Sequence, residues 1–109
     1  MNPEELKSEI RQIFGAQIEF NNAFDQYVTT IKNLDVNLIE WCKQVLDKEI
    51  NPLRAPNAPE LRVFIKKIGS SNRCIVIKLV NGEFREVHLG NHAYYDHLRK
   101  KLGLKKDSL

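Results

Sequence analysis

Residues 61–90 read LRVFIKKIGSSNRCIVIKLVNGEFREVHLG and decide the fold. Apolar and polar residues alternate through much of this stretch with the period of two that a strand requires, and Val, Ile and Phe are abundant. Two groups of turn residues, Gly69-Ser70-Ser71-Asn72 and Asn81-Gly82, divide the stretch into three parts. Asn-Gly predicts a type I′ hairpin, because both central positions of that turn need positive φ. We therefore expect one antiparallel sheet with strands at 61–68, 74–80 and 84–89.

The chain before this stretch is expected to begin with a helix and an edge strand. Asn2, Pro3 and Glu5 form a helix start, because Asn2 can accept from a first-turn N–H, Pro3 is preset for the first helical position and Glu5 can reach back to the cap. Apolar residues then recur at helical spacing until Gly15, which suits a left-handed stop. Ala16–Phe20 (AQIEF) alternates with period two and predicts a short edge strand.

Two more helices are expected before the sheet and one after it. The second helix opens at Asn21 or Asn22, and a break near Asp35 separates it from the third. The third helix ends before the loop NPLRAPNAP (51–59), because the residue preceding a proline is disfavoured in the helical region. Residues 94–102 predict a closing helix. The chain is thus expected to be α+β, with N-terminal helices packed on a C-terminal antiparallel β-sheet and an additional N-terminal helix.

Length and composition indicate a single folded domain. A chain of 109 residues has room for one ordinary core, and 42% hydrophobic with 28% charged residues is a globular balance. No apolar run approaches the roughly 18 to 20 residues that span a bilayer, so we expect a cytoplasmic protein without membrane contact. Cys42 and Cys74 are expected to be buried thiols, although a single disulfide or a two-thiolate metal site stays open.

The net charge of +3 hides an asymmetry between the two halves of the chain. Residues 1–60 hold six Lys or Arg against ten Asp or Glu, a net charge of −4, whereas residues 61–109 hold eleven against four, a net charge of +7. A basic half of this density favours a polyanionic partner such as nucleic acid. The alternative is a solvated basic face with no partner.

Familiar catalytic motifs are missing from the sequence. It lacks GxxxxGK[ST], GxGxxG, GxSxG and paired CxxC, which argues against nucleotide, hydrolase and zinc-ribbon functions. His88, His92 and His97 fall within ten residues, and imidazole is a common metal ligand. They belong to a strand, a loop and a helix in turn, so we do not expect them to converge, and we expect neither a metal nor another cofactor.

Cationic and aromatic side chains concentrate on the predicted sheet and the loop after it: Lys66, Lys67, Arg73, Arg85, His92, Tyr94 and Tyr95. Period two puts Lys66 and Lys67 on opposite faces, so one lysine is expected to face solvent and the other to rim a groove. RNA cleavage without a metal needs such groups. Arg and Lys offset the charge of the phosphorane, a proton acceptor such as His92 activates the 2′-OH, and an aromatic ring stacks a base. The alternative is that Lys66, Arg73 and Arg85 only improve solubility.

The order of elements resembles the RelE/ParE family of bacterial and archaeal toxins. Members start with a short strand, continue with two helices that often end near Asn-Pro, and finish with a curled antiparallel sheet that contains a basic strand-turn-Arg segment. The corresponding segments here are AQIEF (16–20), the helices within 22–50, NPL (51–53), KKIGSSNRCIVI (66–77) and VHLGNHAYYDHL (87–98). The resemblance implies one domain with a core at 16–98, an extra helix within 1–15 and a basic tail at 99–109.

The resemblance also implies a site. In the ribosome-dependent mRNA interferases of this family, a strand Lys, an Arg just after the turn, an Arg or His after the last long strand and a nearby Tyr act on the RNA. These roles fall on Lys66, Arg73, His92 and Tyr94 or Tyr95. Phe64 stands where a second Lys often occurs, and His92 stands where some members have Arg. Further RNA contacts are expected from Lys67, Arg85, Arg99 and Lys100.

Two functions of different classes remain open. In the first, the protein is a toxin that cleaves mRNA in the ribosomal A site, and a cognate antitoxin protein covers its basic groove with an acidic segment. In the second, it is a binder without enzymatic activity, either a gyrase inhibitor of the ParE kind or a nucleic-acid-binding protein that lost its catalytic set. The cation, histidine and tyrosine set favours the enzyme, whereas the missing second Lys favours the binder. A homodimer through the first helix also stays open.

Overall fold

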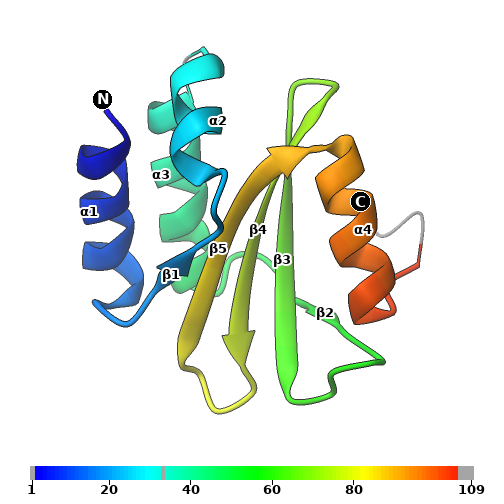
Figure 1. Cartoon of the computed structure of the whole chain (residues 1–109). Helices are drawn as coiled ribbons and strands as arrows, with labels where there is room; N and C mark the ends of the chain where they lie inside the picture. The colour runs from blue at the N-terminus through cyan, green and yellow to red at the C-terminus, as the bar shows by residue number, and fades with distance from the viewer. Residues whose placement is uncertain (1, 33, 106–109) are drawn as a thin grey trace.

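The protein is built around a central β-sheet, and the computed structural model in Figure 1 describes residues 2–32 and 34–105. Within these residues, the strands are β1 (Glu19–Phe20), β2 (Leu53–Arg54), β3 (Leu61–Ile68), β4 (Asn72–Leu79) and β5 (Phe84–Asn91). The helices are α1 (Pro3–Phe14), α2 (Phe24–Thr30), α3 (Leu34–Leu46) and α4 (His92–Leu102). In this part of the chain no helix is long and apolar enough to cross a membrane.

The sheet is mixed, in the order β1-β5-β4-β3-β2. The three long strands form the expected antiparallel meander, and β2 adds to it antiparallel to β3. β1 runs parallel to β5, so the expectation of a purely antiparallel sheet is wrong at this edge. The cause is the connection: α2, α3 and the other strands intervene between β1 and β5, and such a long connection allows two strands to run in the same direction.

Helices cover both faces of the sheet. Figure 1 shows α1, α2 and α3 on one side of the strands and α4 on the other. The first three helices bury their apolar stripes against a sheet face that includes Phe64, Val76 and Val87. α4 packs on the opposite face, over Ile75 and Ile77. The predicted α+β class with N-terminal helices on the sheet is therefore confirmed, and the faces are named here the α3 face and the α4 face.

The N-terminal helix begins as its sequence predicts. The Asn2 side chain accepts a hydrogen bond from the Glu5 N–H (2.8 Å), and the Glu5 carboxylate accepts one in return from the Asn2 N–H (3.5 Å). This capping box satisfies two of the N–H groups that a helix start leaves without intrahelical partners. Leu6, Ile10 and Phe14 are buried on the inner side of α1.

The edge strand and the second helix are shorter than expected, and one residue explains the second difference. Asn21 was expected to open the helix, but its amide instead brackets the backbone of Leu89, donating to the carbonyl and accepting from the N–H, both at 2.9 Å. α2 therefore begins only at Phe24. Of the predicted strand AQIEF, only Glu19 and Phe20 pair with β5.

The second hairpin has a different turn from the one predicted. Asn81-Gly82 does connect two antiparallel strands, and Gly82 has φ +101°. Among the residues that the structure describes, Lys48 is the one non-glycine residue with positive φ, so Asn81 lacks the dihedral that type I′ needs. The Asn81 side chain accepts from the Glu83 N–H (2.9 Å) instead, and the register shifts beside Ile77. The hairpin is confirmed and the type I′ turn is wrong.

The C-terminal segment is more ordered than a tail. The closing helix is confirmed, since α4 ends at Leu102 and Gly103 follows with φ +80°. Residues 99–102 of the expected tail belong to α4, and Leu104 is buried against the α4 face of the sheet. The reason is that the basic residues share this stretch with apolar ones. Residues 106–109 lie outside the described part of the chain.

Candidate functional site

Most of the predicted site residues gather where β5 ends and α4 begins. Gly90 on β5 lies opposite Arg73 on β4, which lies opposite Lys67 on β3. The chain then turns into α4, where the Asn91 side chain caps the helix by accepting from the Tyr94 N–H (2.9 Å). This region is named here the β5–α4 corner, and it consists of Lys67, Arg73, His88, His92, Tyr94 and Tyr95.

Tyr95 stands at the centre of the corner. The guanidinium carbon of Arg73 lies 5.6 Å from the centre of the Tyr95 ring. The His92 ring approaches the same ring edge-on, with 5.8 Å between centroids and an interplanar angle of 67°. Arg73 is buried, with 6% of its surface exposed, whereas His92 is exposed. Three of the five residues predicted to be catalytic therefore contact one another around a single aromatic ring.

A second group in the corner is a chain of short hydrogen bonds. The Tyr94 hydroxyl lies 2.6 Å from His88 Nδ1, and His88 Nε2 lies 2.7 Å from a carboxylate oxygen of Glu86. With a neutral imidazole protonated at Nε2, His88 donates to Glu86 and accepts from the phenol. The side chain of His88 is only 12% exposed, so the chain joins a half-buried phenol to a partly exposed carboxylate.

The environment separates the acidities of the two ends of this chain. The hydrogen bond from His88 holds the pKa of Glu86 below its model value of 4.5. Burial raises the pKa of Tyr94 above its model value of 10.0, and the charge of Glu86 adds to that effect. Near neutral pH, Glu86 is thus a carboxylate and Tyr94 a neutral phenol that can donate a hydrogen bond.

Gly90 leaves the space that Tyr94 occupies. A Cβ placed on Gly90 would lie 2.7 Å from Cδ2, 2.8 Å from Cγ and 2.9 Å from Cβ of Tyr94. All three distances are shorter than real Cβ contacts. The absence of a side chain at position 90 therefore lets α4 approach β5 closely, with the Tyr94 hydroxyl on His88.

Sequence reasoning missed part of this group. It treated His88 only as a metal ligand and did not consider Glu86. Both lie on β5 two residues apart and hence on one face of the strand, and this spacing is the signal that could have linked them. The contact with Tyr94 also requires α4 to cover that face, and nothing local to β5 announces which helix does so.

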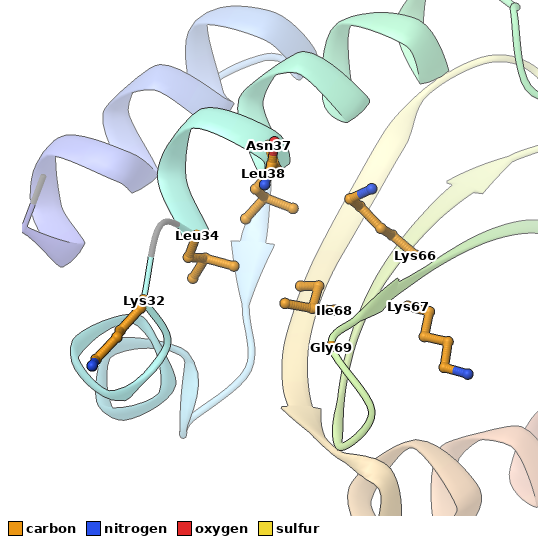
Figure 2. A pocket seen from close by; sticks show the side chains of 8 residues that line it. All are labelled: Lys32, Leu34, Asn37, Leu38, Lys66, Lys67, Ile68 and Gly69. Carbon is orange, nitrogen blue, oxygen red and sulfur yellow. The ribbon is translucent and has the colours of Figure 1, made fainter.

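The two lysines of β3 point to different sides, as period two predicts. Figure 2 shows Lys66 reaching toward α3, and Lys67 pointing away from it. Lys66 lies opposite Cys74, a residue of the α3-face core, and it lines a pocket of about 300 Å³ on that side. Arg73 lies on the α4 face, so the structure does not bring Lys66 together with the other residues predicted to be catalytic.

The four predicted RNA contacts differ in exposure. Lys67, Arg85 and Lys100 are exposed. Arg99 is buried, with 9% of its surface exposed, and it donates to Asp96 (2.7 Å) and to the carbonyl of Leu104 (3.0 Å). Arg99 therefore holds the end of α4 together, while the other three cations are open to solvent.

Neither the cysteines nor the acidic residues and histidines form a metal-binding cluster in residues 2–32 and 34–105. Cys42 and Cys74 are buried free thiols, as predicted. Burial raises the pKa of Cys42 to about 12 and also raises that of Cys74. Both thiols therefore stay protonated at neutral pH, which suits apolar core residues.

The fold and the corner define an α+β protein that has a cationic, aromatic and imidazole-bearing corner at one end of its sheet. Scans of family models, curated proteins and solved structures found no match to this chain. The functional argument therefore starts from the residues of the corner.

Proposed function

We propose that this protein is a toxin of the mRNA-cleaving kind, which acts on mRNA at the ribosome and is neutralised by a cognate antitoxin protein. One observation carries the proposal: Arg73 and His92 both contact the ring of Tyr95, and Lys67 lies beside Arg73 in the sheet. A phosphate-binding cation, a titratable imidazole and a ring able to stack a base are thus within one corner.

The corner can supply each part of RNA cleavage by transesterification. The 2′-oxygen forms a bond to the adjacent phosphorus while the bond to the 5′-oxygen breaks, leaving a 2′,3′-cyclic phosphate and a 5′-hydroxyl. His92 accepts the 2′-OH proton, and solvent returns a proton to the leaving 5′-oxygen. Lys67 and Arg73 offset the charge that develops on the phosphorane, and Tyr95 supports the reacting nucleotide.

Tyr94 and His88 position the catalytic groups in this proposal. Their hydrogen bond ties the first turn of α4 to β5, and that turn carries His92 and Tyr95. The orientation of the imidazole relative to Arg73 thus depends on a contact that does not itself touch RNA. The exposed cations Lys67, Arg85 and Lys100 are where an acidic antitoxin segment would bind.

The test is expression of the protein without neighbouring genes, with growth, translation and mRNA 5′ ends followed together. His92→Ala and Lys67→Ala are suitable variants because both side chains are exposed and folding should persist. His97→Ala and Lys43→Ala are matched controls, since they remove the same groups from exposed positions outside the corner. We expect His92→Ala to slow cleavage by about 10²- to 10⁴-fold, the usual contribution of a general base.

The outcomes separate the alternatives. New mRNA ends inside reading frames with wild type and both controls, but not with His92→Ala, support the endonuclease. Arrest of growth without new mRNA ends would favour a non-enzymatic inhibitor, such as a gyrase inhibitor of the ParE kind, and the position of Lys66 on the other face of the sheet is consistent with that alternative. Normal growth and intact mRNA with soluble wild-type protein would overturn the toxin function altogether.

A further inference from the structure

The pocket on the α3 face lies at the same end of the sheet as the β5–α4 corner, but on the opposite side. Its volume is about 300 Å³, and it opens between the first turn of α3 and the turn that joins β3 to β4 (Figure 2). The polar residues of its lining include Lys32, Asn37 and Lys66, and the apolar ones are Leu34, Leu38 and Ile68. A volume of this size suits one small ligand.

Lys66 is the residue that gives the pocket its chemistry. Its side chain is half-buried and reaches from β3 toward Asn37 (Figure 2). Among the residues that the structure describes, the ion pairs do not include Lys66, and the pocket lining contains no carboxylate. Because a charge removed from water is costly unless it is paired, a half-buried ammonium that faces a pocket favours an anionic ligand.

The remainder of the lining restricts the kind of anion. Leu38 is fully buried and Leu34 nearly so, and together with Ile68 they offer an apolar surface for a flat ring. The Asn37 amide offers both hydrogen-bond donors and an acceptor, which is what reading the edge of a base requires. Phosphate, ring and base edge are the three parts of a nucleotide.

We propose that this pocket binds one nucleotide of the RNA strand, with its phosphate on Lys66 and its base on the leucine and isoleucine side chains beside Asn37. The proposal rests on the proposed function, because it takes RNA as the ligand. Lys67 connects the two sites, since it lines the pocket and also lies opposite Arg73 in the sheet. A strand that passes over the β3 edge would therefore place one nucleotide in the pocket and a neighbouring one at the corner.

The test measures binding without cleavage. Fluorescence anisotropy with a labelled single-stranded RNA that carries 2′-O-methyl groups reports affinity, since the blocked 2′-oxygen cannot attack. Lys66→Met removes the charge but keeps the apolar stem, so packing against the sheet should persist. Lys43→Met on the exposed side of α3 is the matched control, and thermal unfolding verifies that both variants fold.

We expect Lys66→Met to weaken binding about tenfold, as for the loss of a charge-assisted hydrogen bond, and to reduce the salt slope of log affinity by about 0.7. Asn37→Ala should weaken binding and leave the salt slope unchanged, because it removes a base contact. Affinity and slope equal to those of Lys43→Met would overturn the proposal. Methyl resonances of Leu38 and Ile68 that shift with uridine or adenosine monophosphate, but not with the oligonucleotide, would overturn it as well, because the pocket would then serve a free nucleotide.

The two proposals can fail separately. If wild type cleaves mRNA in cells while Lys66→Met binds RNA as well as the control does, the pocket is wrong and the endonuclease stands. If wild type leaves mRNA intact but Lys66→Met loses affinity for the blocked RNA, the pocket stands and the endonuclease is wrong.

Discussion

Replacing Gly90 with alanine tests how the corner is assembled. The new Cβ would lie 2.7 to 2.9 Å from three atoms of Tyr94, whereas ordinary contacts are 3.4–4 Å. One of the three atoms is the Tyr94 Cβ, so rotating the ring cannot relieve the overlap and the start of α4 must move. Overpacking of this kind costs about 1–3 kcal/mol, and the gain from replacing a strand glycine offsets about 0.5–1 kcal/mol of it. We expect a net loss of about 1–2 kcal/mol.

The assay is a double-mutant cycle with Tyr94→Ala, read by urea unfolding. Tyr94→Ala removes two of the three close atoms, so the cost of Gly90→Ala should fall by at least half in that background. Gly69→Ala is the control. A Cβ there meets no described atom within 4 Å, but φ is +61°, so its cost of about 1–2 kcal/mol arises in the backbone and should not depend on Tyr94.

Equal costs of Gly90→Ala in the two backgrounds, within about 0.5 kcal/mol, would refute the close approach of α4 to β5. A second readout follows the contact itself. In Gly90→Ala, the hydrogen bond between the Tyr94 hydroxyl and His88 should lengthen, and the imidazole resonances of His88 should move toward those of Tyr94→Phe. Unchanged imidazole resonances in Gly90→Ala would contradict the geometry even if stability fell.

Three further predictions concern the cap, the carboxylate and the thiols. Asn2→Ala should lower the free energy of unfolding by about 0.5–2 kcal/mol in urea, because it removes the acceptor of the capping box, and an unchanged midpoint would show that the box contributes nothing. His88 lowers the pKa of Glu86 below 4.5, so the stability it contributes is present above pH 4.5 and is lost as the pH falls through the lowered value. The stability difference between wild type and Glu86→Gln should therefore shrink in acid, and a constant difference from pH 6 to pH 3 would contradict this. Because burial raises the pKa of Cys42 to about 12 and also raises that of Cys74, neither thiol should react with a thiol reagent at pH 8 until the protein unfolds; fast reaction of the native protein would place a thiol at the surface.

Much of the fold follows from local patterns in the chain. The change from a helical period to a period of two predicts helices before a meander of strands, and the structure confirms both. Asn2 and Gly103 mark helix ends because their roles depend only on neighbouring backbone groups. The burial of Cys42 and Cys74 follows from their places in apolar patterns.

The site follows less directly, because the sequence by itself determined the side-chain period and not the partners across the sheet. Period two separates Lys66 from Lys67, but only the packing of α3 and α4 on opposite faces decides which lysine joins Arg73. The contact between Tyr94 and His88 likewise requires a helix to cover β5. Such contacts join different elements, so their free energy depends on how the layers pack, and the amino-acid pattern within one element carries no record of it.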